Sequence, residues 1–407
     1  MLEPARECVV ADKTLFDDFQ AAPQWGSKEF GVAINATRQL FNPSAPIDED
    51  RLFAGRLEQV NDLLDIVYER GAHAVIFGER GVGKSSLANT IHARLPSVIT
   101  NIKFIKDNCR PEDSFFDIWS KLLWEFRFDG VEVSEYLKDE TREFVIIKVL
   151  ESLPKENQYT FILDEFDRID VASIKKAMAD TIKHFSDYPQ NITIVVVGVG
   201  SSIDQLFGAH PSIERCCRQI PMQRMSDDEL SEIIGDRYPK IGVMATEAMK
   251  ARLVGLSQGM PGFVHLAGRE AALSALGRQS RNIEEFDYSV SIQESVRRAQ
   301  NSIITAYNKA IYSPKKNAYA EVLLACALAN RNEQGKFSAT DIRDQLRKIF
   351  KDDIEISGFT RHLAAFCDEE RGAVLRKTGK PKRFQYQFID APLQPYIVMV
   401  GKRDGLI

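Results

Sequence analysis

The sequence predicts an α/β fold with a parallel sheet, then a helical unit, then a unit of three helices and a β-hairpin. Short apolar strands alternate with helical segments up to about residue 221. Such alternation is typical of a parallel sheet that helices cover on both faces. The strands then stop and helical segments follow. Near the C-terminus three helical segments precede a hairpin, which is the element order of a winged helix.

The alternating segment is defined by apolar runs and helical periodicity. We expect strands at 74–77, 98–105, 159–163 and 192–199, and helices at 56–70, 84–94, 115–126, 141–153 and 172–185. After residue 221, Ser226 and Glu229 form a capping box that predicts a helix start. Further helices are expected at 245–257, 261–277, 291–312, 318–330, 339–350 and 358–369, and the hairpin turn near 378–381. The resulting domain prediction is 1–45 as an N-terminal arm, 46–222 as the core, 223–285 as a helical unit and 286–407 as a linker helix and winged helix.

Composition restricts the function classes. The formal charge of the 407-residue chain is -5, so any nucleic-acid site must be a local basic patch. The longest apolar run, 192–200, is too short to span a bilayer. Six cysteines are scattered without the spacing of a metal site. We therefore expect reduced thiols in a cytoplasmic protein and no membrane contact.

A glycine-rich segment between a strand and a helix predicts a phosphate site. Residues 78–85 read GERGVGKS and fit the pattern G-x-x-x-x-G-K-[ST] at every fixed position. Backbone N–H groups at a helix N-terminus bind phosphate, and Lys84 should reach the β- and γ-phosphates. Ser85 should bind Mg²⁺ through its hydroxyl. The predicted nucleotide-binding residues are Gly78, Glu79, Arg80, Gly81, Val82, Gly83, Lys84, Ser85 and the adjacent Ser86.

Two carboxylates follow the apolar strand 159–163. Asp164 and Glu165 would lie at the C-terminal end of that strand, where open α/β sheets bind ligands. We expect Asp164 to hold Mg²⁺, directly or through water, and Glu165 to act as general base toward the attacking water. The alternative is an acidic loop after a strand. The order of the two motifs along the chain favours a site that hydrolyses ATP.

With both motifs placed, residues 40–400 resemble the AAA+ and STAND superclass of P-loop ATPases, most closely the origin-recognition-complex branch. The resemblance implies a sheet of the AAA+/ASCE type with a helical lid, and ATP and Mg²⁺ as ligands. It implies that Phe53 and Arg56 lie around adenine, unless this segment is a plain helix N-terminus. It also implies that Ser201 senses the γ-phosphate, although Ser201 could instead cap the next helix.

Three further positions follow from the same resemblance. Arg215, or as second choice Arg218, matches the arginine that reaches a neighbouring subunit's γ-phosphate; a surface ion pair is the alternative. Where many relatives place an arginine in the lid, this chain has Gly262, and the Gly259–Pro261 pattern is of the STAND type. His265, one turn later, either faces the nucleotide or packs in the lid core.

The C-terminal hairpin is strongly basic. Its cations include Arg376, Lys377, Lys380, Lys382 and Arg383, and no acid lies between them. Such a hairpin can contact a DNA backbone, although the acidic segment 368–370 would repel phosphate. A solvated or protein-binding hairpin is the alternative.

Three functions remain open. The first is an ATP-driven switch that couples nucleotide state to homo-oligomer assembly or partner recruitment, for instance in a microbial defence or signalling module. The second is a DNA-binding initiator or helper ATPase of the origin-recognition or transposition type. The third is a scaffold that binds ATP with negligible hydrolysis, against which Glu165 counts.

Overall fold

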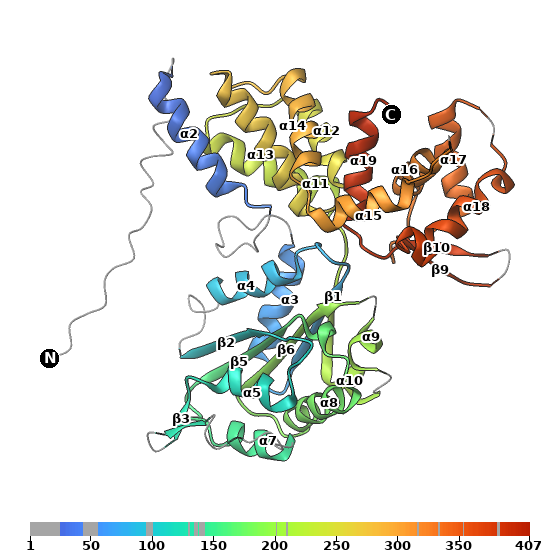
Figure 1. Ribbon diagram of the computed structural model, residues 1–407. Coiled ribbons are helices and arrows are strands. Elements are labelled where there is room, and N and C mark those ends of the chain that lie inside the picture. Colours follow the sequence, from blue (N-terminus) through green and yellow to red (C-terminus); the bar gives the residue numbers. More distant parts are fainter. Residues whose placement is uncertain are drawn as a thin grey trace.

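The computed structural model describes residues 25–43, 56–94, 101–128, 131–133, 137, 143–200, 202–208, 211–315, 317–332, 334–352, 354–380 and 383–407. Its centre is a parallel sheet of five strands in the order β2-β5-β6-β1-β7. The strands are β1 (His73–Gly78), β2 (Ile102–Asn108), β5 (Gln158–Asp164), β6 (Ile192–Val199) and β7 (Cys217–Met222). This confirms the predicted fold class (Figure 1).

The sequence prediction missed β7. The strand lies at one edge of the sheet, beside β1, and only Cys217, Ile220 and Met222 of its six residues are buried. Pro221 can be accommodated because an edge strand leaves one side unpaired. The pattern is therefore too polar to resemble the central strands. The second strand also begins at Ile102, later than the predicted residue 98.

Helices cover both faces of the sheet, because successive side chains of each strand point to opposite faces. In β1, Ala74 and Ile76 join one buried cluster, and Val75 and Phe77 join the other. The first face is covered by α3 (Leu57–Tyr68) and α4 (Lys84–Arg94). The second is covered by α5 (Phe115–Leu123), α7 (Glu143–Glu151), α8 (Ala172–Asp187), α9 (Ile203–Phe207) and α10 (Pro211–Cys216), and a small hairpin, β3 (Arg127–Phe128) and β4 (Val131–Glu132), follows α5.

A helical lid follows β7. It contains α11 (Asp227–Lys240), α12 (Glu247–Ser257) and α13 (Pro261–Gly277). The predicted capping box is confirmed: the Ser226 hydroxyl accepts from the Glu229 N–H at 3.2 Å, and Glu229 accepts from the Ser226 N–H at 2.8 Å. The predicted N-terminal arm contains a helix, α2 (Ser27–Leu40), which packs along the lid helix α13 (Figure 1).

The long helix predicted at 291–312 is wrong. Two helices occupy this segment, α14 (Glu285–Arg297) and α15 (Asn301–Ile311), and Gln300 between them has non-helical backbone angles. The two helices share one neighbour and differ in another. Both pack on α19, but α14 also packs on the lid helix α13, whereas α15 also packs on α16. A straight helix could not present both apolar faces.

The final unit contains α16 (Tyr319–Leu328), β8 (Phe337–Ser338), α17 (Ala339–Phe350), α18 (Ile356–Phe366), β9 (Leu375–Thr378) and β10 (Gln385–Phe388). The strands form an antiparallel sheet in the order β8-β10-β9, so the hairpin has gained a short third strand. The apolar end segment, expected on the hairpin or on a partner, is helix α19 (Leu393–Arg403), which lies against α14 and α16.

The buried clusters divide the molecule into two bodies. One continuous cluster runs from α2 and the lid through α14, α15 and α19 into the final unit. The other two clusters belong to the sheet and its helices. Among the described residues, none of these clusters crosses from the sheet to the lid. The lid and the C-terminal unit therefore share one core, and ion pairs of the residues after β1 connect this core to the sheet. No described helix has the length and apolarity to cross a bilayer.

Candidate nucleotide site

The phosphate loop joins β1 to α4 at the C-terminal edge of the sheet. Gly81 and Gly83 have φ of 85° and 98°, a region that side chains disfavour. At Gly78 the constraint is steric, because a Cβ there would collide with the Met222 carbonyl of the neighbouring strand. Val82 turns away from the loop into the core between the sheet and α4. The loop therefore presents backbone to its concave side, as a phosphate cradle requires.

Lys84 opens α4 and lies beneath the loop. Its ammonium donates hydrogen bonds to the carbonyl oxygens of Gly78 at 3.1 Å and Glu79 at 2.8 Å. Burial lowers the pKa of Lys84 to about 8, against the opposing effect of Asp167, Asp164 and Glu79. The side chain is 8% exposed. A buried ammonium held only by carbonyls gains much from a nearby polyanion.

This pKa leads to a pH prediction. Because ATP favours the charged ammonium, binding above pH 8 requires proton uptake by Lys84. We expect the Kd for ATP to be nearly constant from pH 7 to 8 and to rise by up to about tenfold per pH unit above it. Calorimetry in two buffers with different ionisation enthalpies measures both quantities. A Kd that stays flat up to pH 9.5, without proton uptake, would contradict the lowered pKa of Lys84.

The two acids after β5 lie on the same edge. Asp164 is 4% exposed, and its Oδ2 is 3.0 Å from the ammonium of Lys106 on β2. Its Oδ1 accepts the N–H of Glu165 at 2.9 Å. Glu165 has a positive φ of 57°, and its exposed carboxylate pairs with Arg168 at 3.0 Å. Asp164 is therefore fixed in place, whereas Glu165 is accessible to solvent.

A single cavity of about 1790 Å³ contains these groups and is far larger than one phosphate. Its wall comes from the phosphate loop, from Asp164 and Glu165, from the lid segment 254–265 and from the C-terminal unit. The C-terminal unit supplies Arg331, Asn332, Gln334, Gly335, Arg376, Gln387, Phe388, Ile389, Asp390 and Ala391. No local sequence pattern predicts this contribution, because it depends on how the final unit packs.

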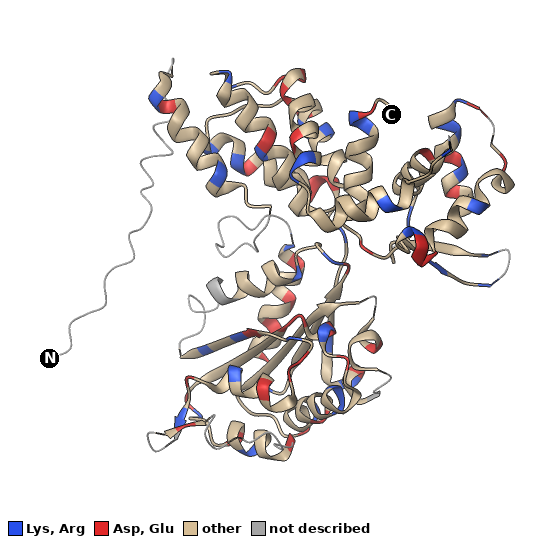
Figure 2. Ribbon diagram, viewed as in Figure 1, with Lys and Arg blue, Asp and Glu red and all other residues tan. Residues whose placement is uncertain are grey.

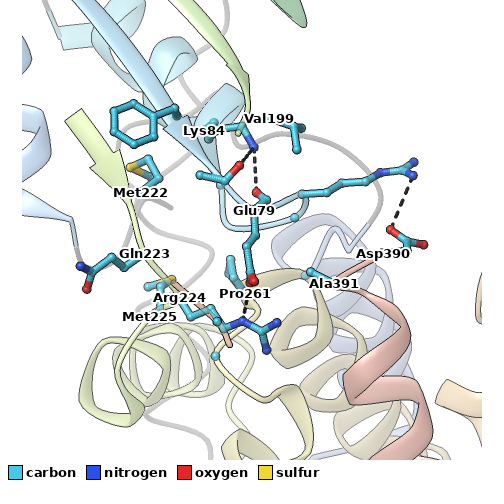
Figure 3. Close-up of a pocket in the computed structure, with 18 of the residues that line it drawn as sticks. Glu79, Lys84, Val199, Met222, Gln223, Arg224, Met225, Pro261, Asp390 and Ala391 are labelled. Carbon is cyan, nitrogen blue, oxygen red and sulfur yellow. Dashed lines mark hydrogen bonds and ion pairs between the residues drawn. The ribbon is translucent and has the colours of Figure 1, made fainter. Parts of the chain in front are cut away.

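Ion pairs connect the loop to the other walls (Figure 3). Glu79 pairs with Arg224, which follows β7, at 2.6 Å, and Arg224 also donates to the Gln258 carbonyl of the lid at 2.9 Å. Arg80 pairs with Asp390 of the C-terminal unit at 3.8 Å. The side chains of Glu79 and Arg80 thus connect the phosphate loop to other parts of the cavity wall, and they point away from the phosphate cradle.

The structure distributes the other predicted site residues unevenly. Ser85 and Ser86 line the cavity, but Arg56 does not; its guanidinium donates to the Gln223 carbonyl, and its N–H donates to Glu229 at 3.4 Å. Burial lowers the pKa of Arg56, opposed by Glu229. Phe53, Ser201 and Lys382 lie outside the described residues.

The two arginine-finger candidates lie at the opposite edge of the sheet. Arg218 is in register with Ala74 near the start of β1, and it pairs with Glu69. Arg215 pairs with Asp187 at 2.9 Å. Neither lines the cavity of its own chain. A contact with a neighbouring subunit's nucleotide stays a prediction.

His265 lies mainly in the lid core. It is 3% exposed, its ring packs edge-on against Phe41 at 5.9 Å, and burial lowers its pKa to about 3, with Arg237 and Arg269 adding to the effect. This arrangement matches the alternative of a packed histidine. A neutral buried ring cannot supply positive charge to phosphate.

The basic residues of the hairpin divide into two groups. Arg376 lines the nucleotide cavity. Lys377 lies 3.6 Å above the ring of Phe384, and Lys380 and Arg383 are exposed. Figure 2 shows lysine and arginine in blue along β9, which contains Arg376 and Lys377.

Comparisons with known proteins agree with this geometry. Residues 68–207 match the family described as "AAA domain". An ORC1-type DNA replication protein of Thermoplasma volcanium is 24% identical over 200 residues, which are 46% of this chain and 48% of that protein. The chain therefore spans about half the length of this curated relative.

Solved structures show the same fold over most of the chain. The ORC2 protein of Aeropyrum pernix, solved in ADPNP–ADP complexes, matches with a TM-score of 0.52 and 15% identity, covering 91% of this chain and 97% of that one. The Walker-type ATPase PABY2304 of Pyrococcus abyssi matches with a TM-score of 0.53 and 17% identity, covering 88% of this chain and 99% of that one. The ORC1 protein of Aeropyrum pernix in complex with DNA matches with a TM-score of 0.50 and 13% identity, covering 90% of this chain and 96% of that one. Residues 68–207 thus resemble an AAA domain, and the chain shares the fold of the solved ORC1 and ORC2 proteins.

Proposed function

We propose that this protein binds ATP with Mg²⁺, hydrolyses it, and transmits the nucleotide state to its C-terminal unit. One observation carries the proposal: the wall of the cavity around Lys84 comes from the sheet, the lid and the C-terminal unit together. A ligand in this cavity would contact both bodies of the molecule at once. The two bodies meet there through polar groups and ion pairs, which rearrange at lower cost than a packed core.

The residues present suit a magnesium–triphosphate complex. The glycine-rich loop offers backbone to the phosphates, and Lys84 supplies a buried cation. Ser85 and Asp164 offer the oxygen ligands that Mg²⁺ prefers, and both line the cavity. Mg²⁺ would supply charge neutralisation at the phosphate oxygens. Lys106 already pairs with one oxygen of Asp164 at 3.0 Å, which orients the carboxylate.

Glu165 would take the proton of the attacking water. Its ion pair with Arg168 is solvent-exposed, with 49% and 45% of the two side chains accessible. Such pairs contribute roughly 1 kcal/mol or less, so the carboxylate can leave Arg168 at little cost. A neighbouring copy would present Arg215 or Arg218 to the same nucleotide, which makes a homo-oligomer or a partner protein part of this proposal.

Hydrogen exchange tests the transmission step. With the Glu165→Gln chain saturated in turn with ATP and ADP, we expect the backbone amides of 331–336 and 385–391 to exchange more slowly with ATP. These segments contain all the described wall residues that the C-terminal unit provides except Arg376. The distant helix α8 serves as an internal control. Equal exchange of both segments in the two nucleotide states would refute the transmission.

The second candidate is a DNA-binding initiator or helper ATPase. It is favoured by the exposed cations of the hairpin, for which no ion pair is found among the described residues. The hairpin belongs to a unit with the element order of a winged helix. In this case the nucleotide would set the position of the DNA-binding surface. The likeness to an ORC1 protein solved with DNA agrees with this candidate.

Removing the hairpin cations separates the two candidates. If the hairpin contacts DNA, replacing Lys377, Lys380 and Arg383 together with alanine should weaken binding by at least about tenfold at low salt. The slope of log affinity against log salt should fall by up to about 0.9 for each lost phosphate contact. Fluorescence anisotropy with a labelled duplex, with and without ATP, measures both effects.

A matched control removes the same charge from other surfaces. Lys28, Lys103 and Lys176 are exposed and lie outside the hairpin. Their triple alanine variant should bind duplex like the parent chain. Equal weakening in both variants would reduce the interaction to nonspecific charge, and no binding by the parent chain at low salt would exclude the DNA candidate.

A further inference from the structure

The strongest unexplained feature of the cavity is an arginine of the C-terminal unit. Arg331 follows α16 and lies on the cavity wall, far along the chain from the phosphate loop. Its Nη2 donates to the side-chain oxygen of Gln258 in the lid at 3.2 Å. Its Nη1 is buried and has no hydrogen-bond partner in the structure. A buried charged donor without an acceptor is costly unless a ligand accepts from it.

The charges around Arg331 do not balance. Burial lowers the pKa of Arg331, and the nearby charge of Arg224 lowers it further, to about 10. Glu79 is the nearby acid, but it is already paired with Arg224 at 2.6 Å. Within the described part of the chain, Arg331 forms no ion pair with a carboxylate. At neutral pH this corner of the cavity therefore carries two guanidinium groups and one carboxylate.

The backbone around Arg331 is well anchored. Asn332 and Lys336 are joined by a backbone hydrogen bond of 2.9 Å, and the side chain of Asn332 accepts the N–H of Lys336 at 2.9 Å. Gln387 of β10 donates to the Gln334 carbonyl at 3.0 Å. Gly335 packs so closely on Glu79 of the phosphate loop that a Cβ would collide with its carboxylate. The arginine is thus held beside the loop.

We infer that Arg331 is a phosphate-binding residue, supplied to the nucleotide by the C-terminal unit of the same chain. The inference rests on the proposed ATP binding and adds a residue to that site. Its free Nη1–H would donate to a phosphate oxygen of ATP or ADP, in the cavity that also contains Lys84 and Ser85. Through the same contact the C-terminal unit would bind the ligand directly. Nucleotide binding and the position of this unit would then be linked.

Calorimetry with two substitutions tests the inference. Arg331→Met keeps an unbranched chain and removes the charge, and it should raise the Kd for ATP and ADP by about tenfold to a hundredfold, as expected for a lost charge-assisted hydrogen bond. Arg331→Lys retains a cation and should recover most of this loss. Arg361→Met removes an exposed arginine from helix α18 of the same unit and should leave the Kd unchanged.

Thermal unfolding without nucleotide distinguishes phosphate binding from a structural role. Because Arg331 is a buried charge without a carboxylate partner, Arg331→Met should leave the Tm unchanged or raise it. A lower Tm, together with an equal loss of affinity in the Met and Lys variants, would assign Arg331 a structural role and overturn the inference. So would an unchanged Kd in Arg331→Met while the parent chain binds ATP. If the parent chain itself binds no ATP, the proposed function fails as well.

Discussion

Replacement of Lys84 with methionine should lower ATP affinity by about a hundredfold or more, which is the largest effect that we expect from a single substitution. The ammonium is the buried cation nearest the phosphate loop, and it would exchange two carbonyl acceptors for phosphate oxygens on binding. Methionine fills the same volume without charge. The loss should be largest for ATP, smaller for ADP and absent for adenosine. Calorimetric titration of the three ligands measures this series.

Lys103→Met is the matched control. Lys103 is an exposed lysine on β2, so its loss changes the net charge equally without touching the cavity. We expect unchanged affinity for all three ligands. The Lys84→Met chain should also fold normally, because removal of a buried ammonium relieves a desolvation cost. ATP binding by Lys84→Met at the parent affinity would show that the phosphate site lies elsewhere.

Glu165→Gln should lower the kcat for ATP hydrolysis by about 10²- to 10⁴-fold and leave the Kd for ATP within a few-fold of the parent value. Glutamine keeps the shape of the side chain but cannot accept the proton of the attacking water. The exposed pair with Arg168 contributes little to stability, so the fold should not change. A single-turnover assay with separately measured binding gives both quantities.

The control for this substitution is Glu156→Gln, an exposed glutamate in the turn before β5. Its kcat should equal that of the parent chain. If Glu165→Gln hydrolysed ATP at the parent rate, the base would have to be another group of the cavity wall. Asp167 would then be the next residue to test, since it lies on the same wall.

The residues of the phosphate site were predictable from local sequence because each motif is short and continuous. The loop 78–85 and the pair Asp164–Glu165 follow strands whose apolar character is evident, and parallel strands bring their C-terminal ends to one edge. Edge strand β7 was missed because half of its residues, including Arg218 and Gln219, are polar or exposed, and it contains Pro221. The break at Gln300 was missed because both flanking segments have good helical periodicity.

The rest of the cavity wall could not be predicted from local pattern. Arg224, Arg331 and Asp390 come from three distant segments of the chain. Arg224 follows β7 of the sheet, whereas Arg331 and Asp390 reach the cavity because the C-terminal unit, through α19, packs on α12 and α14. Nothing in the residues beside Arg331 indicates a phosphate contact. His265 illustrates the opposite case: it lies at the cavity wall, but its ring is 3% exposed and packs against Phe41 from the N-terminal helix segment.

The central claim is that one nucleotide contacts the sheet, the lid and the C-terminal unit together. A crystal structure of the Glu165→Gln chain with ATP and Mg²⁺ tests it most directly. The account predicts a triphosphate on the loop 78–85, with Lys84 and Arg331 both within hydrogen-bond distance of its phosphate oxygens. A triphosphate bound at the loop with the C-terminal unit displaced from it, or no nucleotide in this cavity, would contradict the account.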